Sequence, residues 1–139
     1  MSTLTVLSPE VCWTLLAREE VGRLAVAVAG QPDIFPLNFA VVDGTIVFST
    51  AEGTKLLAVA VDPAVAFEVD GYDPVAGTAW SVVVKGEAEE VPTYEQLEDL
   101  AFPVFPWSAT PKGRFVRIRP TQITGRRFAV IAERQPRSH

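Results

Sequence analysis

Residues 35–55, FPLNFAVVDGTIVFSTAEGTK, constrain the fold of this chain more than any other stretch. Apolar and β-branched residues fill two runs on either side of Asp43-Gly44, a dipeptide that favours a tight hairpin turn. The second run leads into a polar loop ending in Gly53-Thr54-Lys55, before a short segment of helical character. The stretch therefore predicts two strands, over residues 34–42 and 45–50, and a loop at a helix start.

The loop ending in Gly53-Thr54-Lys55 contains the groups that bind a phosphate. Free backbone N–H groups at a helix start, a hydroxyl and an ammonium group would come together there. The neighbouring strand edges, residues 36–39 and 48–50, could hold the molecule that carries the phosphate. Without these strands an ordinary turn with a solvated lysine would be the better interpretation; with them, phosphate binding is favoured.

Cysteine and histidine are too scarce for several classes of site. Cys12 is the only cysteine, so an internal disulfide and a Cys-cluster metal site are excluded. It lies in an apolar helical stretch, which favours a buried structural thiol over a reactive nucleophile. His139 is the only histidine and the last residue, where chains fray. We therefore expect no catalytic triad and no metal site, and a bound cofactor becomes the leading hypothesis.

Length, charge and hydropathy limit the number of domains in the chain and the kinds of partner it can bind. The 139 residues predict a single domain over residues 1–139, with a polar and flexible tail over residues 133–139. A net charge of −5 argues against nucleic acid as a partner. No apolar run is long enough to span a membrane, and no signal peptide is recognisable, so a cytoplasmic protein is expected. The 48% hydrophobic content is best explained by burial between subunits.

Strands dominate the rest of the chain. Alternation predicts strands over residues 23–29, 64–71, 80–91, 115–119 and 122–132. Ser8-Pro9-Glu10 has the features of a helix start, and that helix should end near Arg18. Short helices are also expected over residues 56–61 and 94–100. Short hairpins and few helices favour an antiparallel barrel over a parallel sheet.

Seven short motifs together carry a resemblance to a known family. In order they are VGRLA, PLNF, DGTIVFST, EGTKL, FEVD, WSVVVKG and ITGRR, and they extend over residues 21–127. The chain resembles the flavin-binding split-barrel family related to pyridoxamine 5′-phosphate oxidase, in particular its small actinobacterial-type branch. The resemblance implies a mainly β fold, a six-stranded antiparallel split β-barrel with a few short helices. It also implies a homodimer with FMN in a groove at the subunit interface.

The resemblance further implies which residues hold the cofactor. One strand would line the flavin ring with backbone groups, the next strand would lie beside it, a turn would bind the phosphate, and a third strand would approach from the partner subunit or from beneath the ring. These expected FMN-binding residues are Pro36, Leu37, Asn38 and Phe39; Phe48, Ser49 and Thr50; Gly53, Thr54 and Lys55; and Trp80, Ser81 and Val82.

Two classes of function follow from this resemblance. The first is an FMN-dependent oxidoreductase or reductase acting on a small planar molecule. A flavin carries the hydride or electron chemistry itself, so such a protein needs few catalytic side chains. A deazaflavin is the alternative cofactor. The second is a non-catalytic protein that binds or senses flavin, deazaflavin or haem. The pyridoxamine phosphate oxidases use additional basic and His residues for their substrate, so oxidation of pyridoxamine phosphate itself is not expected.

Several residues have alternative interpretations. Asn38 is either a flavin contact or a buried polar group, and Trp80 and Trp107 are more often core or dimer aromatics than ring-stacking residues. Glu68 and Asp70 share a strand face, where a solvated or arginine-paired role is favoured over a carboxylate pair. Five C-terminal arginines are expected to pair mostly with the acidic residues 87–90, with a smaller chance that one or two bind the cofactor phosphate or an anionic substrate. These are Arg114, Arg117, Arg119, Arg126 and Arg127.

Overall fold

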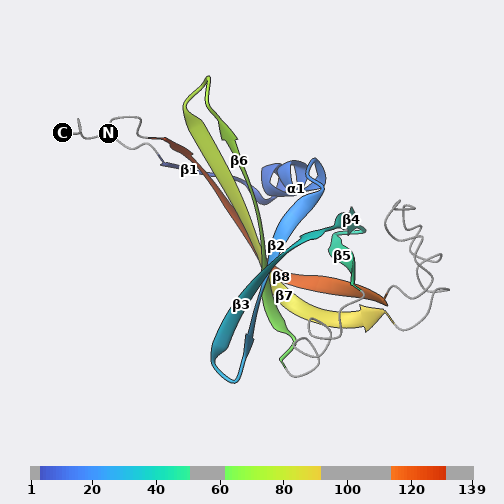
Figure 1. Cartoon of the computed structure of the whole chain (residues 1–139). Helices are drawn as coiled ribbons and strands as arrows, with labels where there is room; N and C mark the ends of the chain where they lie inside the picture. Colours follow the sequence, from blue (N-terminus) through green and yellow to red (C-terminus); the bar gives the residue numbers. More distant parts are fainter. Residues whose placement is uncertain (1–3, 51–61, 92–113, 131–139) are drawn as a thin grey trace.

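The computed structural model describes residues 4–50, 62–91 and 114–130, which form one helix and eight strands (Figure 1). The elements are β1 (Leu4–Val6), α1 (Pro9–Ala17), β2 (Val21–Val28), β3 (Gln31–Asn38), β4 (Ala40–Val42), β5 (Thr45–Thr50), β6 (Ala64–Asp73), β7 (Thr78–Val91) and β8 (Arg114–Ala129). All strand pairs are antiparallel, in the order β3-β2-β6-β7-β8-β5-β4, and β1 pairs with β8. The expected mainly β split barrel is confirmed, with seven strands in the continuous path rather than six.

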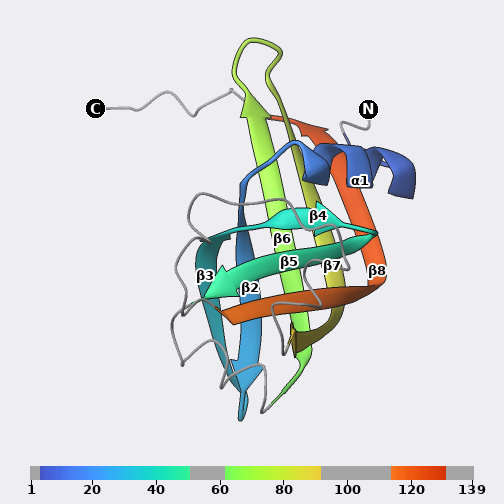
Figure 2. The ribbon, with the colours of Figure 1, turned by 90° about the vertical axis from the view of Figure 1, so that its right-hand side faces the viewer.

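The sheet curls so that its two ends face each other. Figure 2 shows β4, β5 and the first part of β8 crossing over β2, β3, β6 and β7. Apolar side chains from both layers fill the space between them, and Phe48 and Phe67 are among the largest that are fully buried. This arrangement leaves the opposite, outer face of β2, β3, β6 and β7 outside the core.

The chain departs from the expected strand over residues 34–42 at Phe39. The amide of Phe39 donates a hydrogen bond to the carbonyl of Glu20 at 3.0 Å. Its buried ring meets the ring of Phe67 edge-on, with centroids 4.8 Å apart. These contacts with other elements divide the expected strand into β3 and β4, whereas the Asp43-Gly44 turn, with both φ angles positive, forms as predicted.

The two strands expected at the C-terminus form one long strand, β8, interrupted by a bulge. The register with β7 shifts between Lys85 and Gly86, and the hydroxyl of Thr121 donates to the carbonyl of Lys85 at 3.1 Å. Before the bulge Ile118 lies in the core, and after it Ile123 packs against the core. The bulge therefore shifts the inward-facing positions of β8 from even to odd residue numbers.

The N-terminal helix packs on β8 through a small contact. Ser8 accepts a hydrogen bond from the amide of Val11 at 3.2 Å, which confirms the predicted cap. Cys12 is fully buried, and a Cβ built on Gly125 would lie 2.5 Å from its sulfur, so the helix can approach only because residue 125 is glycine. Burial raises the pKa of the Cys12 thiol, so the expected buried structural thiol is confirmed.

Five sequence predictions fall outside the described residues. They are the phosphate-binding turn at Gly53-Thr54-Lys55, the helices over residues 56–61 and 94–100, Trp107, and the tail over residues 133–139.

Candidate functional site

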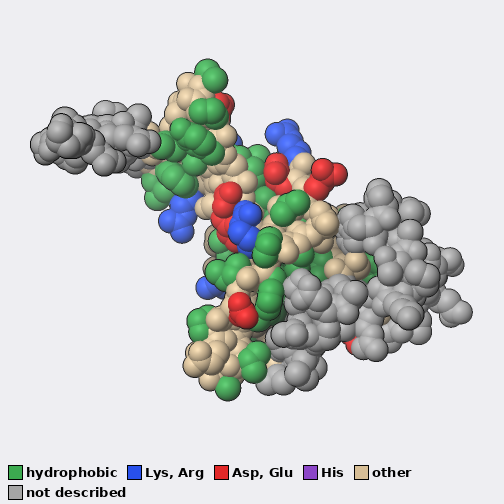
Figure 3. Space-filling view, viewed as in Figure 1, with side chains coloured by type: hydrophobic (Ala, Val, Ile, Leu, Met, Phe, Trp, Pro, Cys, Tyr) green, Lys and Arg blue, Asp and Glu red, His purple; other side chains and the backbone are tan. Residues whose placement is uncertain are grey.

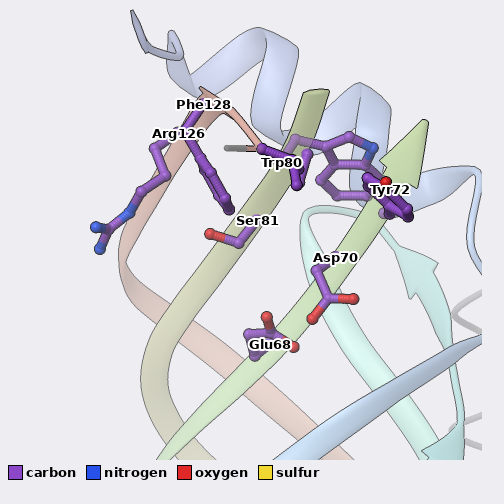
Figure 4. Close-up of a pocket in the computed structure, with 10 residues that line it drawn as sticks. Glu68, Asp70, Tyr72, Trp80, Ser81, Arg126 and Phe128 are labelled. Carbon is purple, nitrogen blue, oxygen red and sulfur yellow. The ribbon is translucent and has the colours of Figure 1, made fainter. Parts of the chain in front are cut away.

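An open hollow of about 620 Å³ lies where β6, β7 and β8 present their outer faces, within the size range of ligand pockets (Figure 4). Acidic, aromatic, hydroxyl and basic side chains surround it. Its lining residues are Glu68, Asp70, Gly71, Tyr72, Ala79, Trp80, Ser81, Arg126, Phe128 and Val130.

The two carboxylates at the hollow are bound to an arginine of β2. Arg23 Nε lies 2.7 Å from Glu68 Oε1, and its Nη2 lies 3.2 Å from Asp70 Oδ2. Burial raises the pKa of Glu68, the neighbouring Asp70 raises it further, and Arg23 opposes both effects. The arginine-paired interpretation of the two carboxylates is thus confirmed. Arg23 was not identified from the sequence, because only the β2–β6 pairing brings it opposite Glu68.

Three aromatic side chains give the hollow its apolar surface. Tyr72 is 61% exposed, whereas Trp80 is half-buried and packs against the core. Trp80 lies over Gly71, where an added Cβ would be 2.5 Å from its Nε1. Phe128 lies on the neighbouring strand, and its ring is directed toward Ser81 in Figure 4. Trp80 therefore serves as a core aromatic, as expected, and also borders the hollow.

The expected ring-binding residues of β3 divide between two faces. Pro36 and Asn38 lie on the outer face, and Asn38 is exposed, so its alternative role as a buried polar group is wrong. Leu37 and Phe39 are buried in the core and could offer a ligand only their backbone groups. Because β3 is the edge of the sheet and proline has no N–H, Pro36 presents a carbonyl and no donor at that edge.

The next expected group belongs to β5, which approaches β3 without pairing with it. Phe48 is fully buried, Ser49 is half-buried, and Thr50 ends the strand. The structure thus brings the β3 and β5 groups together. Gly53, Thr54 and Lys55, the expected phosphate-binding residues, lie outside the described part of the chain.

The expected residues of β7 stand apart from those of β3 within one chain. Val82 is fully buried, and Ser81 faces the hollow with Trp80 at its border. Two strands, β2 and β6, separate β3 from β7, a distance of about 14 Å at the usual strand spacing. The Arg23–Glu68–Asp70 ion pairs occupy the intervening surface.

Some of the C-terminal arginines form the ion pairs that were expected with the acidic residues 87–90. Arg117 Nη2 lies 2.5 Å and Arg119 Nε 3.1 Å from the same carboxylate oxygen of Glu89. Arg126 and Arg127 make no ion pair within residues 4–50, 62–91 and 114–130, and Arg126 borders the hollow. The sequence did not identify Tyr72 or Phe128; they come into the site through the β6–β7 and β7–β8 pairing.

Replacing Glu89 with Gln should flatten the acid side of the stability profile. The hydrogen bond from Arg117, aided by Arg119, holds the pKa of Glu89 below its ordinary value of 4.5. The ionised carboxylate therefore stabilises the fold fully above pH 4.5, and this contribution is lost as the pH falls through the lowered pKa. Glu89 is 42% exposed and solvent screens it, so we expect a loss of about 0.5–1 kcal/mol at neutral pH. Urea unfolding of wild type and variant from pH 7 to pH 3 measures the difference in the free energy of unfolding. A difference that stays constant over this pH range would contradict the prediction.

The described residues contain neither a candidate metal site nor a helix that could cross a membrane. No three His, Cys, Asp or Glu side chains in these residues are grouped closely enough to hold a metal ion. The helix in this part of the chain is too short to cross a membrane.

Comparisons with known proteins agree with the motif resemblance. A family model described as pyridoxamine 5′-phosphate oxidase matches residues 8–127. The uncharacterised protein Rv0080 of Mycobacterium tuberculosis is 36% identical over 119 residues, which cover 82% of this chain and 78% of that protein. An FAD-binding protein from Mycobacterium smegmatis is 42% identical, with a TM-score of 0.76 over 89% of this chain and 99% of that one. A haem-binding protein from the same species shares the fold alone, at 19% identity and a TM-score of 0.69 over 91% of this chain and 57% of that one.

Proposed function

The chain belongs to the pyridoxamine 5′-phosphate oxidase family, and from this premise we propose that it is a flavin-binding oxidoreductase acting on a small planar molecule in the cytoplasm. FMN is the expected flavin. The 42% identical FAD-binding protein supports flavin binding and makes FAD the form that must be distinguished from FMN. A deazaflavin is a further alternative.

The observation that carries this proposal is the chemistry of the hollow. Tyr72, Trp80 and Phe128 offer flat apolar surfaces suited to an aromatic ring system. The Ser81 hydroxyl can donate to or accept from a ring heteroatom, and the Arg126 guanidinium can bind an anionic group. A bound flavin would supply the hydride or electron chemistry, and these residues would orient it and exclude water.

We further propose that two copies of the chain share each site. One copy would contribute β3, the end of β5 and the turn at Lys55; the other would contribute Trp80 and Ser81 of β7. The separation of β3 from β7 by two strands supports this division, since one chain presents the two groups at a distance. A homodimer would bring the β7 group of one copy to the β3 and β5 groups of the other.

A non-catalytic role in binding or sensing flavin, deazaflavin or haem is the second candidate. It is favoured by the ion pairs of Arg23 with Glu68 and Asp70, which engage both carboxylates of the hollow rather than leaving them free for proton transfer.

Mass spectrometry of the small molecule released from freshly purified protein tests the proposal. We expect FMN, or FAD as in the mycobacterial relative, and we expect a nicotinamide donor to bleach the flavin absorbance of the intact protein. A tightly bound flavin that no donor reduces would favour the binding role. Haem, or no flavin after reconstitution with FMN and FAD, would contradict the proposed function.

A further inference from the structure

We infer that β3 carries a built-in block against strand addition. Pro32, Pro36 and the side chain of Asp33 remove three successive N–H donors from the free edge of this strand, and so prevent copies of the chain from joining there edge to edge into larger assemblies. The proposed function places a ligand near this edge but no added strand, and the block goes beyond it.

The long free edge of the sheet is β3. Within the described residues the path of paired strands ends at β3 on one side and at β4 on the other, and β1 lies beyond β8. β1 and β4 have three residues each, whereas β3 has eight. A long edge strand presents a row of unpaired N–H and C=O groups, which is a template for pairing with another strand.

The side chains at this edge favour such pairing. Ile34, in the middle of β3, is 63% exposed. Figure 3 shows apolar side chains over the projecting hairpin of β2 and β3, at the lower end of the molecule. Because apolar contacts between neighbouring strands stabilise a sheet, protection of this edge depends on its backbone groups.

The turn between β2 and β3 determines which backbone groups point outward. Ala29 and Gly30 both have positive φ angles and form a two-residue turn. The pair that flanks such a turn, Val28 and Gln31, exchanges both hydrogen bonds, and hydrogen-bonded and non-hydrogen-bonded pairs alternate from there. The odd-numbered residues of β3 therefore bond to β2, and the N–H and C=O groups of the even-numbered residues face the free edge.

Three of the four outward positions offer no free donor. Pro32 and Pro36 have no N–H, and the amide of Ile34 donates to Oδ1 of Asp33 at 3.0 Å. A strand added at these positions would meet only carbonyl groups, so its own carbonyls would lose water without gaining a donor. Asn38, at the end of β3, is the one outward position that keeps an N–H for this edge.

The position of Asp33 along the strand supports this role. Side chains alternate between the two faces of a strand, and Asp33 shares its parity with Phe35 and Leu37, which pack on the core side. Its partner on β2 is the buried Val26. A carboxylate thus stands where the alternation calls for an apolar residue, and a charge on the inward side is one of the features that protect edge strands.

Restoring the missing donors tests the block. Pro32→Thr combined with Asp33→Ala returns an N–H to residue 32 and frees the amide of Ile34, without adding a large apolar side chain. Association between copies should become at least about ten-fold stronger than in wild type, because two main-chain hydrogen bonds become available at the edge. Sedimentation velocity over a range of concentrations should show species larger than those of wild type, and hydrogen exchange should show the amides of residues 32 and 34 protected in them. Pro36 stays unchanged because it belongs to the expected cofactor-binding residues.

Asp73→Ala combined with Pro74→Thr is the matched control. It makes the same two substitutions at the turn between β6 and β7, where Oδ1 of Asp73 accepts hydrogen bonds from the amides of Val75 and Ala76 at 3.0 and 3.1 Å. Donors are freed there in a turn rather than along a strand edge, so association should stay within about three-fold of wild type. Far-ultraviolet circular dichroism checks that the variants are folded.

The block is refuted if the Pro32→Thr, Asp33→Ala variant associates like wild type, or if its larger species leave the amides of residues 32 and 34 unprotected. If this variant does not fold, Asp33→Ala alone changes one exposed side chain and frees the Ile34 amide. It should still associate more strongly than wild type, and equal association would overturn the inference. Every variant is compared with wild type in the same assay, so the outcome is independent of flavin binding and of the oligomeric state of wild type.

Discussion

Replacing Gly86 with alanine is expected to lower the free energy of unfolding by about 3 kcal/mol, toward the upper end of single substitutions. Gly86 is buried at the bulge where β7 and β8 change register. A Cβ there would overlap the carbonyl oxygen of Arg119 and would lie 2.9 Å from its carbonyl carbon and 3.0 Å from the Cα of Pro120.

The obstacle at Gly86 is backbone rather than side chain, which is why the effect is large. The strands cannot separate at this point without weakening the ladder that joins the two longest strands of the sheet. Gly71→Ala is a useful comparison, because its added Cβ meets the side chain of half-buried Trp80, which can shift. Urea unfolding at a fixed protein concentration should therefore show a smaller loss for Gly71→Ala. A Gly86→Ala variant within about 0.5 kcal/mol of wild type would contradict the role assigned to the bulge.

Replacing Lys55 with alanine should weaken flavin binding at least about ten-fold. The prediction comes from the sequence, where Lys55 follows Gly53-Thr54 in the turn proposed to bind the phosphate. Losing a charge-assisted hydrogen bond to a phosphate costs about 1.5–3 kcal/mol, which corresponds to this change in affinity.

Arg134→Ala is the control for Lys55→Ala, because it removes one positive charge from the polar C-terminal segment, away from the proposed turn in sequence. Fluorescence titration of the apoprotein with FMN measures both affinities. Equal affinities of the two variants would remove the phosphate role of Gly53-Thr54-Lys55, even if wild type binds FMN tightly.

Much of the fold could be predicted because the strands follow local alternation. The strand expected over residues 45–50 coincides with β5, and that over residues 80–91 differs from β7 by two residues at its start. The break at Phe39 could not be predicted, since the sequence continues as a strand and only contacts with Glu20 and Phe67 interrupt it. Here tertiary packing overrides local preference.

The site could be predicted less well, because its lining depends on pairing between distant strands. Motif resemblance identified Trp80 and Ser81, which do border the hollow. Whether Arg126 faces the hollow depends on the bulge, which reverses the alternation along β8. Gly86 and Pro120, two residues that disrupt regular strands, were the signals of that bulge.

The central claim is that a flavin is held between two copies of this chain, and sedimentation followed through the flavin absorbance tests it most directly. A ligand bound only by the dimer stabilises the dimer by mass action, so flavin binding and dimerisation should be linked. We predict that flavin absorbance sediments only with a species of twice the 15.1 kDa chain mass, and that dilution to monomer releases the flavin. Flavin absorbance that sediments with a 15.1 kDa species, at an affinity unchanged by dilution, would contradict the account.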